Sequence, residues 1–218
     1  MDYVPQRCHF SFRYWYDYSG GTMTDWGAHH NDIALWAINQ PGPVAVEAKP
    51  LADLIPGGYT AYSEYEAKFT YADGVVQTVR TTRDDSPTGG TVNEKGQRNG
   101  IKFEGSTGWI WVNRGEIQAS TDDLIETPLP AGAVRLYDSQ NHMGNFFDCI
   151  RSRKAPIAEA AVGHRSATIC HLGASALRTG AALKWDPAAE KFHGDHAKEA
   201  NAFVTREMRK PYTYDFIA

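Results

Sequence analysis

Hydrophobic and polar residues alternate along several stretches of the chain, and this pattern predicts strands. Over residues 10–18 one side of an extended segment would be fully aromatic and the other mostly polar. These two sides are Phe10, Phe12, Tyr14, Tyr16 and Tyr18, and Ser11, Arg13, Trp15 and Asp17. Further strands are predicted over residues 44–48, 63–71, 74–83, 100–104, 108–113 and 116–120. Glycines at positions 74 and 115 predict hairpin turns, so we expect an antiparallel meander.

Apolar residues that recur with a helical period predict three helices. The first runs from an N-cap at Thr24 to about residue 39, and the second runs from a cap at Ser139 to about residue 153. The third covers about residues 159–179. The apolar stripe of the second helix is Met143, Phe146, Phe147 and Ile150, and core candidates of the third are Val162, Ile169, Leu172 and Leu177.

Strands that follow one another, with helices before and after them, predict an α+β fold. We expect one domain over residues 1–218, built on a large, mostly antiparallel open sheet with helices packed on one face. Residues 84–100 predict a long exposed loop, and the tail predicts a short helix near residues 197–205. One sheet face should be half-polar, yet the aromatic content favours a homo-oligomer through the sheet face.

Charge and composition exclude several classes of protein. The net charge is −4, from 22 basic and 26 acidic residues that are interleaved, so no nucleic-acid footprint is present. Apolar runs are too short for a membrane span, and no secretory signal opens the chain. The chain is therefore expected to be soluble, and cytoplasmic if no signal precedes it. Cys8, Cys149 and Cys170 are far apart in sequence, which favours reduced thiols over a disulfide framework.

The richest chemistry lies in residues 20–32, where two glycines precede the first predicted helix. Residues four apart on a helix share a face, so Asp25 and His29 would meet, with Asp32 one turn further on. A carboxylate that orients an imidazole is what a general base acting on a hydroxyl needs. The pattern alone favours structural roles, in which the Asp25 carboxylate interacts with the helix dipole and His29 is a half-buried polar side chain.

A metal site is the next possibility, because Asp25, His29, His30 and Asp32 are all ligand types. His30 projects about 100° round the helix from His29, so the four cannot converge on one ion. Asp25 and His29 could bind one ion together. Further histidines could complete such a site, but His164 and His171 lie about 10.5 Å apart along their helix and cannot share one ion. The sequence has no G-x-S-x-G, G-x-G-x-x-G or phosphate-binding loop motif.

Several motifs of the chain resemble one family. GGTMTDWGAHHND at residues 20–32 is similar to the G-G-x-x-x-D-x-G-x-H-x-x-D segment of the Gfo/Idh/MocA oxidoreductases, the glucose–fructose oxidoreductase and inositol dehydrogenase group. RYWYDY at 13–18, GHRSATICHL at 163–172, LKWDP at 183–187 and the closing residues 206–214 carry the same resemblance. Together these motifs cover nearly the whole chain.

The resemblance implies an enzyme with a Rossmann domain that binds NAD or NADP and a second domain for substrate contacts and oligomer formation. This chain looks like the second domain only, so it should bind no cofactor alone, and a separate Rossmann subunit is one possible partner. His29 would be the base, and Asp25 would orient it. Substrate contacts, to a carbohydrate-like molecule, would come from Arg13, Trp15, Tyr16, Asp32 and His164. EAKP at 47–50 is not the family's E-K-P motif, so the family's catalytic lysine is missing.

Three functions follow from these observations. The first is the substrate half of an NAD(P)-dependent sugar or polyol oxidoreductase, not competent for hydride transfer alone. A second is a cofactor-independent hydrolase or lyase acting on a sugar, ester or lactone, with His29 as base and a metal as a possible addition. The third is a non-catalytic domain that binds or assembles through its sheet.

Overall fold

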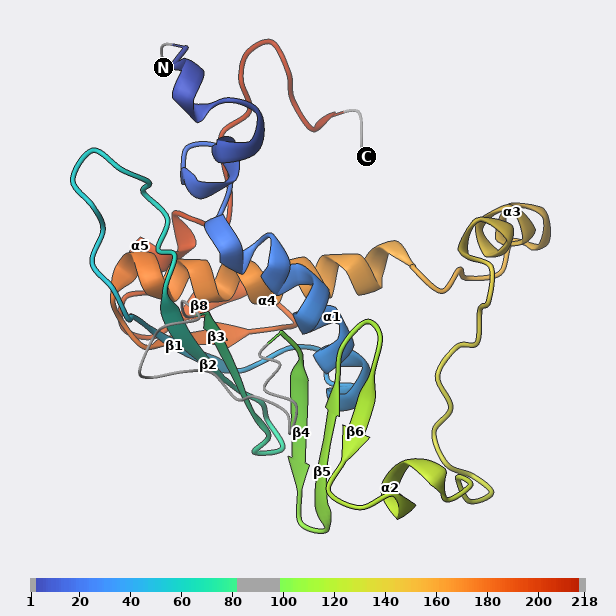
Figure 1. The fold of residues 1–218 in the computed structure, drawn as a ribbon. Helices are drawn as coiled ribbons and strands as arrows, with labels where there is room; N and C mark the ends of the chain where they lie inside the picture. The colour runs from blue at the N-terminus through green and yellow to red at the C-terminus, as the bar shows by residue number, and fades with distance from the viewer. Residues whose placement is uncertain (1–2, 82–98, 216–218) are drawn as a thin grey trace.

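The computed structural model describes residues 3–81 and 99–215 (Figure 1). Its main sheet has five strands in the order β3-β2-β1-β7-β8, and every neighbouring pair is antiparallel. These strands are β1 Ala45–Pro50, β2 Tyr65–Thr70, β3 Val76–Thr81, β7 Leu183–Asp186 and β8 Lys191–His193. The predicted α+β class and the antiparallel sheet are confirmed.

The sheet is divided, however, because three strands form a second sheet of their own. β4 Ile101–Gly105, β5 Gly108–Val112 and β6 Ile117–Ala119 pair in the order β4-β5-β6. A hollow of about 390 Å³ lies between β3 and β4, and side chains of both strands and of the first helix line it. Within the described part of the chain, β3 and β4 exchange no ladder of backbone hydrogen bonds.

Two helices, α1 Trp26–Ile38 and α4 Ala160–Thr179, contribute to a core against one face of the five-stranded sheet. Gly173 lets α4 lie close to its neighbours, since a Cβ there would come within 2.7 Å of Met23 Cε and 3.1 Å of Phe69 Cζ. The predicted helices are thus confirmed, with the bounds shifted by a residue or two. Buried side chains of this core include Val46, Tyr65, Phe69, Ile169, Leu172, Leu177, Leu183 and Trp185.

The opposite face of this sheet carries cross-strand ion pairs. Glu66 on β2 pairs with Lys49 on β1 at 3.1 Å and with Arg80 on β3 at 2.6 Å, while Lys68 pairs with Glu47 at 3.3 Å. Lys49, helped by Arg80, lowers the pKa of the Glu66 carboxyl. The alternation along β2 therefore separates a buried face from a charged one, as predicted. A homo-oligomer through this face stays a prediction.

The aromatic segment near the N-terminus is not a strand. It forms short 3-10 helices whose backbone hydrogen bonds are local, such as Trp15 N–H to the Phe12 carbonyl at 3.2 Å and Tyr18 N–H to the Trp15 carbonyl at 2.9 Å. The alternating pattern fitted a strand, but a strand needs a neighbouring strand to receive its backbone groups. Phe12 is 45% exposed as a result. The short helices are η1 Pro5–Arg7, η2 His9–Tyr14 and η3 Gly21–Met23.

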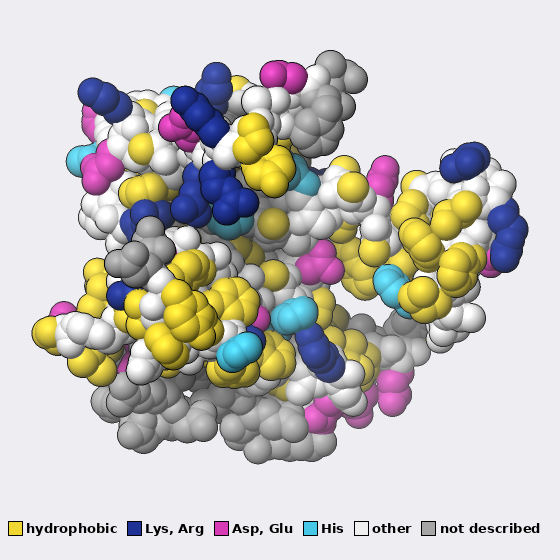
Figure 2. Space-filling view, turned by 90° about the horizontal axis from the view of Figure 1, so that it is seen from above, with side chains coloured by type: hydrophobic (Ala, Val, Ile, Leu, Met, Phe, Trp, Pro, Cys, Tyr) yellow, Lys and Arg dark blue, Asp and Glu magenta, His cyan; other side chains and the backbone are white. Residues whose placement is uncertain are grey.

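Helix α3, His142–Ser152, extends away from the rest of the molecule (Figure 1), and Figure 2 shows a cluster of apolar side chains on it. Its N-cap is Asn141, whose side chain accepts a hydrogen bond from Gly144 N–H at 2.9 Å, and not the predicted Ser139. The predicted apolar stripe is present but uncovered. Its members and their exposed fractions are Met143 at 59%, Phe146 at 50%, Phe147 at 48% and Ile150 at 45%.

Both predicted hairpins are present, with different turn chemistry. Gly74 has a φ of +90°, as a tight turn requires, whereas Gly115 has no positive φ. The second turn is held by Asn113, whose Oδ1 accepts hydrogen bonds at 2.9 Å from the backbone N–H groups of Gly115 and Glu116. This side chain fixes the turn that presents Arg114.

The tail adds β7 and β8 to the sheet, then α5 Ala197–Asn201, which is shorter than predicted. α2 Asp123–Glu126 is a single turn before the segment that leads to α3. Most of the predicted loop at residues 84–100 lies outside the described residues. None of the described helices has both the length and the apolar character that crossing a bilayer requires. The three cysteines form no disulfide.

Candidate active site

The start of α1 is built by the glycine-rich turn before it. Gly21 has a φ of +72°, and a Cβ there would lie 2.7 Å from Ala61 Cβ, so glycine is needed. Thr24, predicted as the N-cap, instead holds this turn, because its Oγ1 accepts from Gly20 N–H at 3.1 Å and donates to the Gly21 carbonyl at 3.3 Å. The N-cap position is Asp25, whose side chain makes no capping hydrogen bond.

The Asp25 carboxylate pairs with Arg13, with 2.7 Å between Oδ2 and Nη1. The side chains are 25% and 31% exposed, so the pair is partly shielded from water. No hydrogen bond joins Asp25 to His29 within the described residues. The structure therefore brings two of the predicted site residues together and ties η2 to the start of α1. The expected contact between Asp25 and the imidazole is not formed.

Replacing Arg13 by alanine should lower the free energy of unfolding by about 1 kcal/mol, because a partly shielded, charge-assisted hydrogen bond is lost. Arg151→Ala is the matched control: its pair with Asp148 is also 2.7 Å long, but the two side chains are 73% and 75% exposed. That change should cost no more than about 0.5 kcal/mol. Urea unfolding measures both, and equal losses would contradict the role given to the Arg13 pair.

Buried polar contacts fix how α1 is rotated about its axis. Asn31, 1% exposed, donates to Cys170 Sγ on α4 at 3.3 Å and accepts from Gln77 Nε2 on β3 at 2.8 Å. Asp32 Oδ1 accepts a 2.6 Å hydrogen bond from the Ser166 hydroxyl on α4. Asp32, predicted to bind substrate, thus fastens α1 to α4.

The side of α1 that carries Trp26, His29 and His30 is more open. His29 is exposed, and its ring centroid lies 5.6 Å from that of Trp26, edge to face. His30 stacks on Trp26 with 6.0 Å between centroids and an interplanar angle of 22°. Burial, with His29 and Arg114 nearby, lowers the pKa of His30. His30 is consequently a neutral imidazole at pH 7, able to donate one hydrogen bond and accept another.

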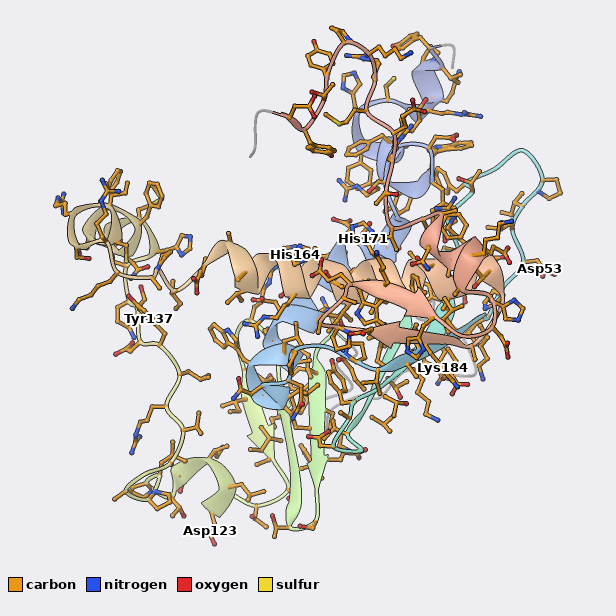
Figure 3. The ribbon with its side chains drawn as sticks, turned by 180° about the vertical axis from the view of Figure 1, so that it is seen from behind. Asp53, Asp123, Tyr137, His164, His171 and Lys184 are labelled. Carbon is orange, nitrogen blue, oxygen red and sulfur yellow. The ribbon has the colours of Figure 1, made fainter. Side chains whose placement is uncertain are left out.

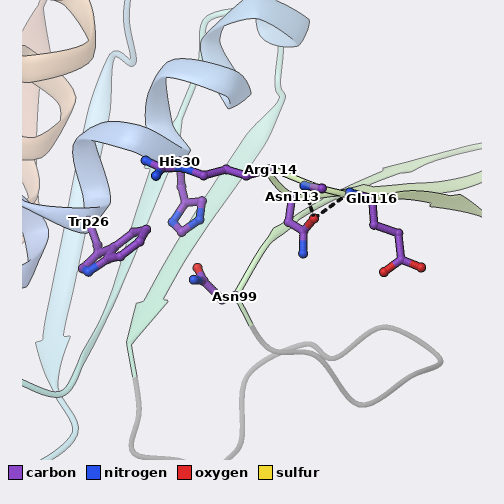
Figure 4. Close-up of a pocket in the computed structure, with 7 residues that line it drawn as sticks. Trp26, His30, Asn99, Asn113, Arg114 and Glu116 are labelled. Carbon is purple, nitrogen blue, oxygen red and sulfur yellow. Dashed lines mark hydrogen bonds between the residues drawn. The ribbon is translucent and has the colours of Figure 1, made fainter.

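A pocket of about 430 Å³ opens beside this side of α1, between Trp26 and the β5–β6 turn (Figure 4). Arg114 lies over Trp26, with Cζ 5.2 Å from the ring centroid. His30, and not His29, lines the pocket. Sequence reasoning missed the residues of the turn: the N-R-G stretch signalled a hairpin, but nothing in the sequence placed it opposite α1. The lining residues are Trp26, His30, Asn99, Asn113, Arg114, Gly115 and Glu116.

The other predicted substrate residues lie elsewhere. Trp15 is buried, with Arg7 Cζ 4.0 Å from its ring centroid, and Tyr16 lies beneath Arg178 at 4.8 Å. His164 is on α4 (Figure 3), where its Nε2 is 2.6 Å from Glu190 Oε1 in an exposed pair. None of these side chains lines the pocket at Trp26, so their substrate contacts stay predictions.

Three tyrosines with raised pKa values make the free energy of unfolding depend on pH in the alkaline range. Burial raises the pKa of Tyr16 to about 12, and burial also raises those of Tyr65 and Tyr71. An unfolded tyrosine titrates near pH ~10, so above that pH the unfolded chain loses protons that the folded chain keeps. The free energy of unfolding should fall as pH rises above about 10. Urea unfolding across this range should give a shallower fall for Tyr16→Phe; an identical slope would contradict the assignment.

The described residues do not fit a nicotinamide nucleotide. A dinucleotide fold needs parallel β–α–β units and a glycine-rich turn. Every pair of neighbouring strands in the described structure is antiparallel, and the sequence lacks the glycine motif. No three metal-ligating side chains come together anywhere in residues 3–81 and 99–215.

A family model described as the C-terminal alpha/beta domain of an oxidoreductase family, Gfo/Idh/MocA, matches residues 1–214. The chain belongs to this family. The resemblance in residues 20–32 is thereby confirmed over nearly the full chain. No match was found among curated proteins.

Solved structures share the fold of this Gfo/Idh/MocA domain. Levoglucosan dehydrogenase in complex with NADH and levoglucosan is 20% identical with a TM-score of 0.55, over 83% of this chain and 55% of that chain. Aldose-aldose oxidoreductase from Caulobacter crescentus, complexed with glycerol, is 16% identical with a TM-score of 0.55, over 79% and 50%.

The WlbA dehydrogenase from Bordetella pertussis, in complex with NADH and UDP-GlcNAcA, is 15% identical with a TM-score of 0.53, over 80% and 48%. At these identities the likeness shows the fold alone. This domain therefore spans about half the length of the solved chains that it resembles.

Proposed function

We propose that this domain is the substrate-binding and proton-accepting half of an NAD(P)-dependent sugar or polyol oxidoreductase. The observation that carries the proposal is an exposed His29 in the first turns of α1, beside the partly exposed ring of Trp26, in a domain of this oxidoreductase family. Two solved relatives, of which this chain covers 48% and 55%, hold NADH together with a sugar-derived ligand.

The chemistry asked of His29 is removal of a proton from a hydroxyl. When a secondary alcohol is oxidised, the C–H bond breaks and its electron pair leaves with the hydrogen as hydride, while the O–H proton passes to a base and a carbonyl forms. A bound nicotinamide nucleotide would take the hydride. An imidazole nitrogen of His29 takes the proton, since histidine accepts and releases protons near neutral pH.

Arg13 and Asp25 position this base. Their 2.7 Å pair holds the N-terminal segment against the start of α1, while the Asp32–Ser166 and Asn31–Gln77 hydrogen bonds hold the same helix against α4 and β3. A helix fixed at both its start and its buried side cannot rotate freely. His29 is thereby kept on the open side, where a hydroxyl can reach it.

Hydride transfer is expected only when a nucleotide-binding domain completes the enzyme, because the residues described above do not fit the nucleotide. That domain, in the same polypeptide or as a separate subunit, is the partner proposed here. The test is formation of reduced nicotinamide from sugars and polyols by the completed enzyme, with His29 intact or replaced. Turnover that does not need His29 would overturn the proposal.

A further inference from the structure

The pocket beside α1 contains a cation, Arg114, that pairs with no acidic side chain of the described residues. Arg114 forms no ion pair with any residue in the described ranges, and its guanidinium lies over Trp26 at 5.2 Å from the ring centroid. Figure 4 shows the Arg114 side chain reaching toward His30, whereas the Glu116 carboxylate points away from it. An arginine fork presents donors in the geometry that matches a carboxylate.

The β5–β6 turn that carries Arg114 is held by hydrogen bonds of its own. Asn113 Oδ1 accepts two hydrogen bonds of 2.9 Å from the backbone that follows Arg114, and Asn113 N–H donates to the Glu116 carbonyl at 3.0 Å. The turn therefore does not need to be ordered by a ligand, which lowers the entropic cost of binding. Trp26 supplies an aromatic wall on the other side of the pocket.

Apart from Glu116, the other described groups that line the pocket are uncharged, and most of them are polar. His30 is neutral at pH 7, because burial, with His29 and Arg114 nearby, lowers its pKa, and Asn99 adds an amide. Amides and a neutral imidazole donate to and accept from hydroxyl groups. One cation beside neutral hydrogen-bonding groups, with the Glu116 carboxylate pointing away from it, suits a ligand that carries a single negative charge and several hydroxyls. A doubly charged phosphate would lack a second cation.

Resting on the proposed function, we propose that this pocket is a substrate subsite that binds the carboxylate of an acidic sugar, a uronate or aldonate, through Arg114. Trp26 connects the pocket to the proposed base, since its ring also lies 5.6 Å from that of His29. A sugar acid anchored at Arg114 and packed on Trp26 would extend toward His29 with its hydroxyl groups. Arg114 is thus the residue that sets specificity for the acid.

The test is calorimetric titration of the full chain, without nucleotide, with glucuronate, its neutral methyl ester, glucose and glucose 6-phosphate. Glucuronate should bind at least about tenfold more tightly than the ester, as expected for a charge-assisted hydrogen bond, and should weaken with added salt. Equal affinity for glucuronate and ester, or tighter binding of the phosphate, would overturn the inference.

Variants assign the effect to one side chain. Arg114→Gln should remove the preference for glucuronate over its ester, whereas Arg135→Gln, an exposed arginine on the segment before α3, should leave it unchanged. Trp26→Ala should weaken glucuronate and ester alike, because it removes the shared wall. A preference that survives Arg114→Gln in a chain with an unchanged circular dichroism spectrum contradicts the assignment.

Failure here is distinguishable from failure of the proposed oxidoreductase. If the chain binds glucuronate through Arg114 but the completed enzyme oxidises no sugar acid, the subsite stands and the proposed function fails. If the completed enzyme oxidises neutral sugars through His29 and the chain shows no preference for the acid, the function stands and the subsite fails.

Discussion

His29→Ala is expected to lower kcat of the completed oxidoreductase by about 100- to 10,000-fold, the usual contribution of a positioned general base. KM should change far less, because His29 is exposed and does not line the pocket where the rest of the substrate is proposed to bind. The measurement is the initial rate of reduced-nicotinamide formation at several pH values.

The matched control is His142→Ala, an exposed histidine in the first turn of α3. It should leave kcat within about twofold of the unmodified enzyme, since surface changes away from a site have small effects. A His29→Ala enzyme that keeps kcat within the same range, with its pH profile unchanged, would show that another group takes the proton.

Phe69→Ala should be strongly destabilising and should lower the free energy of unfolding by about 3–5 kcal/mol. Phe69, on β2, is 0% exposed, and a Cβ at Gly173 on α4 would lie 3.1 Å from its Cζ. Urea unfolding gives the loss as a change in midpoint at constant slope.

Phe147→Ala removes the same side chain from a different environment. Phe147 is 48% exposed on α3, which stands apart from the core, so the loss should stay below about 1 kcal/mol. A loss as large as that of Phe69→Ala would mean that α3 packs on the body of the domain in solution. Both outcomes are read from the same unfolding curves.

The helices could be predicted because their patterns are local. The 3.6-residue period of α4 selected four core candidates, of which Ile169, Leu172 and Leu177 are buried, whereas Val162 in the first turn is only half-buried. α1 could be placed by its glycine-rich start, and β2 by the alternation that separates Phe69 from Lys68. In each case the residues that decide the structure lie close together in the sequence.

Contacts between distant residues could not be predicted. Arg114 meets Trp26 only because the small sheet folds back toward α1, and Arg13 meets Asp25 only because residues 9–14 coil instead of extending. Period-2 alternation describes side-chain chemistry, and it does not reveal whether a neighbouring strand exists. β7 and β8 were missed for a different reason. They are too short to show a period, and they are stabilised by pairing, β7 with β1 and β8 with β7.

The most direct test of the central claim is a comparison of parts. Three samples are compared: this chain, a nucleotide-binding domain of its family, and a mixture of the two. Each is incubated with NAD or NADP and a panel of sugars, polyols and sugar acids. Reduced nicotinamide should form only when both parts are present and His29 is intact. Its formation by the chain alone, or conversion of a substrate by the chain without any nucleotide, would contradict the account.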